Sequence, residues 1–94
     1  MKVKDKQLFL QRSRIEIIAC LLRNSSKGSR KTRLIYGCNL SVSQFNKYAE
    51  YLIEGRLLEK RIDENSEVYY ITEKGMEFLK DYEGIKKLLD KIHL

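Results

Sequence analysis

Apolar and polar positions follow a helical period over the first well-patterned stretch, residues 14–24. The apolar stripe consists of Ile15, Ile18, Ala19 and Leu22. Ile17 and Leu21 lie beside it and widen it. Ser13 precedes Glu16 by three residues, which is the capping-box spacing that satisfies free amides at a helix start. We therefore predict a first helix over residues 14–24 with this stripe facing the core.

A second helix is predicted over about residues 30–37. The stretch 24–28, Asn-Ser-Ser-Lys-Gly, is typical of a turn, and Ser29 is the expected N-cap of the helix that follows it. At the other end, Gly37 fits the left-handed position that terminates a helix. Leu40 would then place its side chain under the angle between this helix and the next.

The third helix follows a tight turn and so forms a helix-turn-helix with the second. Ser41 and Gln44 make another capping box, which places the helix start near Val42. The core-facing residues have helical spacing and are Phe45, Tyr48, Ala49 and Leu52. The opposite face begins with short hydrogen-bonding side chains and one lysine, the chemistry that binds base edges and phosphates. Such residues also collect at helix starts as caps, so this face alone leaves both interpretations open.

Two strand-like runs come next, residues 57–62 and 67–72, separated by the polar residues 63–66. This pattern predicts a β-hairpin, and a hairpin behind three helices is the wing of a winged helix. The hairpin tip is acidic and would repel phosphates. Lys60 and Arg61 at its base are therefore the better candidates for contact with DNA.

The last helix is predicted to begin after an N-cap at Thr72 and to continue to about Ile92. Its apolar residues are spaced alternately four and three apart, as in a heptad seam: Phe78, Tyr82, Ile85, Leu89 and Ile92. With such a seam, one face can pack on the domain and another on a second copy. Gly84 costs about 1 kcal/mol in a helix relative to alanine, which close packing at that point would explain.

This order of elements predicts an α+β, mainly helical fold, a winged helix-turn-helix with a long C-terminal coiled-coil helix. The predicted parts are a basic N-terminal arm over residues 1–12, the winged helix-turn-helix domain over 13–72, and a C-terminal dimerisation helix over 73–94. In the arm, Lys2, Lys4 and Lys6 are placed to touch DNA.

Length and composition narrow the class of protein. Ninety-four residues fit one domain with a modest core. No stretch approaches the roughly 18 apolar residues of a membrane span, and the N-terminus lacks the apolar run of a secretory signal, so we expect a cytoplasmic protein. Cys20 and Cys38 are accompanied by a single histidine, which is too few ligands for a structural zinc. We expect two buried thiols.

The net charge of +6 is distributed unevenly. Residues 1–33 carry ten basic and two acidic side chains, whereas residues 34–56 carry two of each. If the first third lies beside the helix-turn-helix, it forms a basic face suited to a phosphate backbone. A merely solvated surface is the alternative, but the clustering beside a plausible reading helix favours the functional interpretation.

These observations predict a protein that binds double-stranded DNA, in an architectural or a regulatory role, and associates with the nucleoid. The predicted contacts are Arg30, Lys31, Arg33, Ser41, Ser43, Gln44, Asn46, Lys47, Lys60 and Arg61. The first three surround a helix start, whose free amides form a natural phosphate site. The expected partners are DNA and a second copy of the chain, with no membrane and no small-molecule substrate.

No catalysis is expected. The sequence shows no triad-like pattern, no phosphate-binding glycine loop and no residues for a cofactor or metal. An alternative is a protein-interaction winged-helix module whose last helix is a coiled-coil handle, although such a module has no need of a basic first third. RNA binding is disfavoured because Tyr69 and Tyr70 fall on opposite faces of one strand.

Three motifs occur in order: K-T-R-L-I-Y-G-C-N-L-S at residues 31–41, Y-x-x-x-L-I-E-G-R-L-L at 48–58, and Y-Y-I-T-E-K-G-M-E-F-L at 69–79. Together they resemble the archaeal winged-helix proteins of the ten-kilodalton Sulfolobus chromatin type (the 10a class), over about residues 13–92. The resemblance implies a homodimer that binds double-stranded DNA, with the C-terminal helices paired antiparallel. Two features depart from that family: the wing is longer and more acidic, and Arg56 stands where a glycine is usual.

Overall fold

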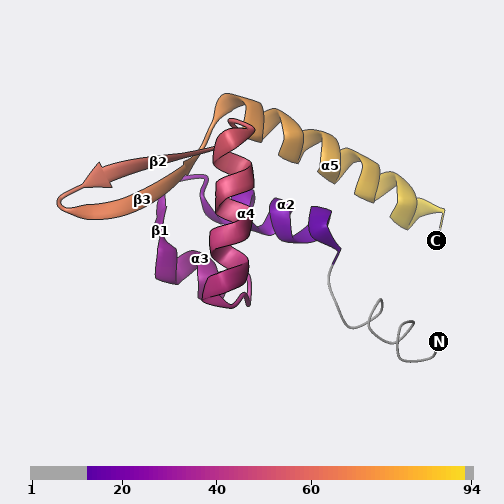
Figure 1. Ribbon diagram of the computed structural model, residues 1–94. Coiled ribbons are helices and arrows are strands. Elements are labelled where there is room, and N and C mark those ends of the chain that lie inside the picture. The colour runs from indigo at the N-terminus through magenta and orange to yellow at the C-terminus, as the bar shows by residue number, and fades with distance from the viewer. Residues whose placement is uncertain (1–12, 93–94) are drawn as a thin grey trace.

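The computed structural model describes residues 13–92, and Figure 1 shows its elements. In chain order they are α2 (Arg14–Asn24), β1 (Ser29–Arg30), α3 (Lys31–Gly37), α4 (Val42–Glu54), β2 (Leu58–Asp63), β3 (Ser66–Ile71) and α5 (Glu73–Lys91). This order confirms the predicted winged helix-turn-helix followed by a long C-terminal helix. The predicted basic arm, with Lys2, Lys4 and Lys6, lies outside the described residues.

The helix starts follow the predicted caps at three places. The Ser13–Glu16 and Ser41–Gln44 capping boxes both form, with hydrogen bonds of 3.2 Å and 3.0 Å respectively. At α5, the Thr72 hydroxyl accepts from an amide of the first turn at 3.0 Å. Each cap satisfies amides that would otherwise lack partners, which fixes these boundaries from local sequence.

The start of α3 was predicted wrongly. Ser29 is not its N-cap, because it lies in the two-residue strand β1, opposite Tyr69, and its hydroxyl donates to the Asn24 carbonyl at 2.6 Å. Arg30 is the N-cap and makes no side-chain capping bond. Strand β1 completes an antiparallel sheet in the order β1-β3-β2. Pairing with a distant strand therefore decided the role of a residue that local pattern had assigned to a helix.

Two turns also differ from the expectation. Gly37 is the last residue of α3, and the left-handed position falls at Asn39, with φ 55°. In the wing, Glu64 and Asn65 alone form the loop, with φ 50° and 66°, as in a two-residue type I′ hairpin. The two wing strands therefore extend closer to the tip than predicted.

The core lies where α2, α3 and α4 meet the sheet. Its buried members are Ile17, Leu21, Leu22, Leu34, Cys38, Leu40, Phe45, Ala49, Leu52, Leu58 and Tyr69. The rings of Phe45 and Tyr69 meet edge to face, with centroids 5.3 Å apart. Ile15 was assigned to the core stripe but is 45% exposed, because the first turn of α2 extends beyond the elements it packs on. The buried stripe is centred on its neighbours Ile17 and Leu21 instead.

Cys20 and Cys38 form a disulfide, so the prediction of two thiols was wrong. Their Cα atoms lie 5.9 Å apart, and the bond links α2 to the first residue after α3. The Asn24 side chain packs beside the bond, and its amide donates to the Cys20 carbonyl at 2.8 Å. The disulfide thus fixes the start of the turn that leads into α4.

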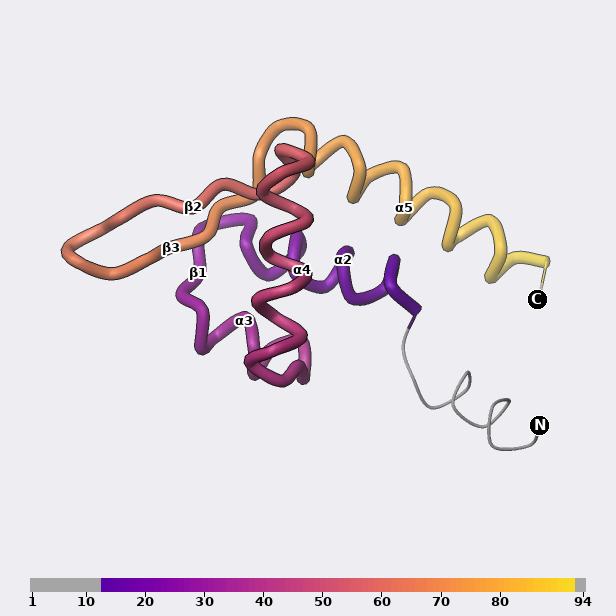
Figure 2. Tube along the Cα trace, viewed as in Figure 1, coloured from indigo at the N-terminus to yellow at the C-terminus, as the bar shows by residue number. Residues whose placement is uncertain are grey.

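Helix α5 packs on the domain at its first turns and then extends away from it, as Figure 2 shows. Gly75 is buried, and a Cβ there would collide with the Leu57 carbonyl. Further along, an ion pair of 2.7 Å joins Arg23 of α2 to Glu83. Gly84 has no atom within 4 Å of its Cβ position, so the close packing predicted there is not supplied by the described chain itself. Among residues 13–92, no helix is long and apolar enough to span a membrane.

Candidate nucleic-acid interface

The first turn of α4 uses two of the predicted contact residues for capping. The Ser41 hydroxyl accepts from the Gln44 amide, and the Gln44 side-chain oxygen accepts from the Ser41 amide, each at 3.0 Å. The side-chain carbonyl of Gln44 is therefore bound to its own helix start. The capping interpretation accounts for these two residues, although the hydroxyl and the amide NH₂ remain at the surface.

Three other predicted residues of α4 point outward without partners. Ser43, Asn46 and Lys47 are exposed, and none makes a side-chain hydrogen bond or an ion pair within the described part of the chain. They follow one another on the first two turns of the helix. Glu50 and Glu54 occupy the same outer side on later turns, so only the N-terminal half of α4 suits a negatively charged ligand.

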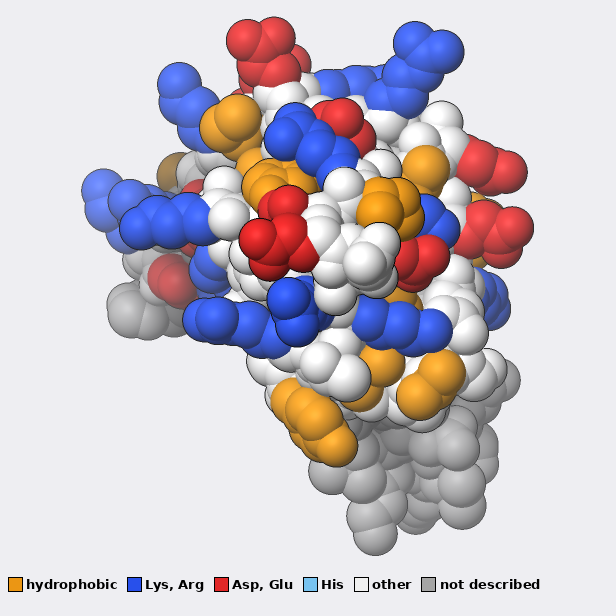
Figure 3. All heavy atoms as spheres, turned by 90° about the vertical axis from the view of Figure 1, so that its left-hand side faces the viewer, with side chains coloured by type: hydrophobic (Ala, Val, Ile, Leu, Met, Phe, Trp, Pro, Cys, Tyr) orange, Lys and Arg blue, Asp and Glu red, His pale blue; other side chains and the backbone are white. Residues whose placement is uncertain are grey.

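A basic hollow lies between the start of α3 and the wing. Its volume is about 430 Å³, and its lining includes Lys27, Arg30 and Arg33 together with Tyr70 and one acidic residue, Asp63. None of these three cations pairs with a carboxylate among residues 13–92. Figure 3, which looks along the wing, shows a row of Lys and Arg side chains across this face, with acidic side chains above it. Exposed cations beside a helix start are the kind of groups that bind phosphate, so this hollow keeps Arg30 and Arg33 as predicted contacts.

The remaining predicted cations are already engaged. The Lys31 ammonium lies 5.8 Å from the centroid of the Phe45 ring and is half-buried. In the wing, Lys60 is 3.7 Å from the Glu67 carboxylate. Arg61 pairs with Glu59 at 3.2 Å, which raises the pKa of the Arg61 guanidinium. These contacts reduce the positive charge that the wing offers to a phosphate.

Arg61 also lies over the ring of Tyr70, with its guanidinium carbon 4.3 Å from the centroid. Gly28 approaches the same ring so closely that a Cβ there would collide with it, and its φ is 87°. Sequence reasoning missed Lys27 and Tyr70 as parts of this surface. Lys27 stands in a turn, and only the pairing of β1 with β3 brings that turn beside the wing.

The structure thus divides the predicted residues into two groups. One group consists of exposed cations or hydrogen-bonding groups that have no side-chain partner within residues 13–92, on or next to the helix-turn-helix: Arg30, Arg33, Ser43, Asn46 and Lys47. The others serve as caps, pack on an aromatic ring or pair with carboxylates of the wing. Whether either group contacts DNA stays a prediction.

A model of the family described as "Winged helix-turn-helix" matches residues 11–90. The chain belongs to this family. An uncharacterized protein of Methanocaldococcus jannaschii is 33% identical over 73 residues, which cover 77% of this chain and 71% of that protein.

Among solved structures, the winged-helix chain is similar to Sso10a-2, a DNA-binding protein from Sulfolobus solfataricus. The TM-score is 0.79 and the identity 28%, with 87% of this chain and 86% of that chain covered. This likeness confirms the resemblance to the ten-kilodalton Sulfolobus type. F93 from STIV, a winged-helix DNA-binding protein, has a TM-score of 0.66 at 21% identity, covering 82% and 92%. MepR of S. aureus reaches 0.74 at 10% identity, covering 97% and 70%, and like F93 supports the fold alone.

Proposed function

We propose that this protein binds double-stranded DNA as a homodimer, with the N-terminal half of α4 in the major groove. The observation that carries the proposal is the set of exposed, unpartnered cations and hydrogen-bonding side chains on the helix-turn-helix. Lys47 and Arg33 contact phosphates, whereas Asn46 and Ser43 reach base edges. The capping residues Ser41 and Gln44 contribute to binding through the Ser41 hydroxyl and the Gln44 side-chain NH₂, which remain at the surface.

The comparisons support this proposal. Sso10a-2, at 28% identity over most of both chains, is described as a DNA-binding protein, and the family is a winged helix-turn-helix family. Sso10a-2 and F93 are both described as DNA-binding proteins and not as enzymes, in line with the expectation of no catalysis. A role as a protein-interaction module accounts less well for unpaired cations on this surface.

Helix α5 supplies the surface for the second copy. Phe78 and Leu79 pack against the core, and Tyr82 is half-buried, so the first part of the predicted seam serves the domain itself. The last part lies in solvent: Ile85 is 60% exposed, Leu89 44% and Ile92 57%, and Leu88 beside the seam is 62% exposed. Pairing two such helices removes this apolar surface from water. The 10a resemblance implies that they pair antiparallel.

The role is either architectural or regulatory. Few of the exposed side chains on this surface can read bases, and most of them suit the phosphate backbone of DNA. We therefore favour binding that depends little on sequence, as expected of a protein that coats DNA in the nucleoid. A regulatory role would require a preferred site, and Asn46 and Ser43 would then determine it.

Fluorescence anisotropy with random and chosen duplexes across a salt series tests the proposal. If about six phosphates are neutralised per bound unit, log K should fall with log salt with a slope of about −5. We expect similar affinities for all duplexes. A slope near zero would refute the electrostatic basis of binding.

Alanine substitutions test whether DNA binding depends on this surface or on the charge of the chain as a whole. Arg33→Ala and Lys47→Ala together should weaken binding to all duplexes and make the salt slope shallower by about two. Lys74→Ala, an exposed cation at the start of α5, is the control and should change little. Full affinity in the double variant would instead favour the protein-interaction module.

A further inference from the structure

The turn after α4 is built around Arg56 in a conformation that suits glycine better. Arg56 has φ 63°, whereas Gly55 before it has φ −79° and does not use its freedom. A left-handed conformation costs stability in a residue with a Cβ, and such positions gather at functional sites. The Arg56 amide donates to the Ile53 carbonyl at 3.0 Å, and its carbonyl accepts from the Thr72 hydroxyl at 2.6 Å. The backbone of Arg56 is thus held on both sides.

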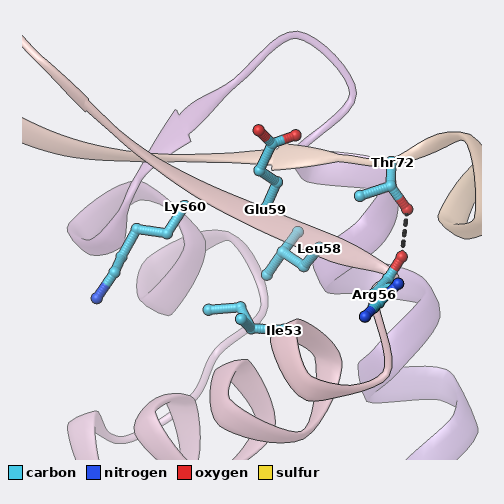
Figure 4. A pocket seen from close by; sticks show the side chains of 6 residues that line it. All are labelled: Ile53, Arg56, Leu58, Glu59, Lys60 and Thr72. Atoms are coloured by element: carbon cyan, nitrogen blue, oxygen red, sulfur yellow. Dashed lines mark hydrogen bonds between the residues drawn. The ribbon is translucent and has the colours of Figure 1, made fainter.

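Arg56 borders a hollow of about 560 Å³ between the end of α4, the start of β2 and the start of α5 (Figure 4). Its lining consists of Ile53, Arg56, Leu58, Glu59, Lys60 and Thr72. Ile53 supplies apolar surface above the buried Leu58, and Arg56 supplies positive charge, whereas Lys60 already pairs with Glu67. Glu59 points away from Ile53, and its carboxylate accepts hydrogen bonds from Arg61.

We propose that this hollow binds a small amphipathic monoanion, such as an aryl carboxylate. Its apolar body would pack on Ile53, and its carboxylate would bind the Arg56 guanidinium, which makes no hydrogen bond or ion pair within residues 13–92. The volume is in the range of small-molecule sites, which combine apolar walls with a few polar groups. Glu59 in the lining disfavours an anion with several charges.

A ligand in this position would contact three elements at once. Ile53 belongs to α4, Lys60 to the wing and Thr72 is the N-cap of α5. This step rests on the proposed function, in which these three elements are the reading helix, the wing and the dimer helix. A carboxylate on Arg56 would place negative charge between the reading helix and the wing, where DNA binding needs positive charge, and the ligand would hold the end of α4 against β2. Ligand binding and DNA binding would therefore oppose each other, by the same factor in both directions.

Binding is tested without DNA, so its outcome is independent of the proposed function. Indole-3-acetate is titrated into the ¹⁵N-labelled protein, with indole-3-acetamide as the neutral analogue of the same shape. We expect amide shifts confined to the residues around the hollow and a dissociation constant of about 1 mM or lower for the acid alone. Equal binding of the amide, or no shifts with the acid, would overturn the proposal.

Variants of Arg56 test whether its guanidinium binds the carboxylate of the ligand. Arg56→Asn tolerates the left-handed conformation and removes the charge, so it should fold and bind the acid about tenfold more weakly. Arg56→Lys keeps the charge and should bind more tightly than Arg56→Asn. Lys74→Gln, outside the hollow, should bind as the wild type does. Unchanged binding in Arg56→Asn would show that the arginine is not the anion's partner.

Fluorescence anisotropy with a DNA duplex tests whether ligand binding and DNA binding oppose each other. Saturating indole-3-acetate should weaken DNA binding by the wild type, with no effect on Arg56→Asn. If Arg56→Asn by itself weakens DNA binding and the acid does not bind, Arg56 is a phosphate contact and the ligand site is refuted. If the wild type fails to bind DNA but binds the acid, the proposed function fails while the site stands.

Discussion

At the scale of single residues, two glycines of α5 have opposite structural roles. Gly75 is buried at the point where α5 crosses the carbonyl of Leu57, and no side chain fits there. Gly84 stands in open space on the same helix, so its missing side chain serves no packing within the described chain. Sequence pattern suggested close packing at Gly84, because a mid-helix glycine is costly. The need for a glycine follows from the distance to other elements, which the pattern does not contain.

The glycine pair gives a matched prediction. Gly75→Ala should lower the free energy of unfolding by about 1 to 3 kcal/mol, because a Cβ forces the helix away from Leu57. Gly84→Ala should raise it by about 1 kcal/mol through helix propensity. Urea denaturation of both variants measures the two values. A destabilised Gly84→Ala would indicate that a second copy packs against this glycine.

At the scale of elements, the disulfide joins α2 to the end of α3 across 18 positions of the chain. Closing a loop of that length stabilises a fold by about 3 kcal/mol in the chain-entropy model. Replacing both cysteines by serine should therefore lower the free energy of unfolding by about that amount, as measured by urea denaturation under non-reducing conditions. Reductant should destabilise the wild type and leave the double variant unchanged. Equal stability of wild type and double variant in oxidising buffer would contradict this role.

The ion pair between α2 and α5 makes a prediction about pH. The hydrogen bond from Arg23, aided by its charge, lowers the pKa of the Glu83 carboxyl. A lowered pKa in the folded state means that the pair stabilises the protein above the ordinary carboxyl pKa and loses this contribution as the pH falls through the lowered value. Arg23→Gln should raise the Glu83 pKa toward its ordinary value, although Lys86 and Lys87 still lower it, and ¹³C NMR titration of the carboxyl can measure the change. Because both side chains are exposed, the gain in stability should be small.

At the scale of the whole molecule, the C-terminal part of α5 is the surface that one copy leaves uncovered. Leu89 is 44% exposed and lies among other apolar residues of the predicted seam. Leu89→Lys should break the proposed homodimer, because pairing would bury an unpaired charge, and should leave the helix-turn-helix folded. DNA affinity should then fall far more than one lost contact explains, because bivalent binding is lost.

Light scattering at micromolar concentration and circular dichroism measure these effects. Glu77→Lys, also on α5 but outside the seam, is the control for adding a positive charge, and it should remain dimeric. A monomeric wild type, or a dimeric Leu89→Lys with unchanged DNA affinity, would mean that α5 serves its own domain alone.

The sequence by itself determined the starts of three of the four described helices, the hairpin and the order in which helices and hairpin follow one another. Capping boxes and apolar periods act over three to seven residues, so they can be read locally, and the starts of α2, α4 and α5 agree with them. The same holds for the outer face of α4, because a helix of known start and core side has a defined opposite side. Tertiary structure was not needed to find Asn46 and Lys47.

Only the tertiary structure decided which of the predicted residues are free. Ser29 pairs in a sheet with a residue 40 positions away, the cysteines meet across two helices, and Lys60 of β2 meets the carboxylate of Glu67 on β3. The hollow at Arg56 likewise forms where α4, β2 and α5 come together. Such contacts depend on the packing of segments that are distant in the chain, and a periodic pattern carries no information about the distance between them.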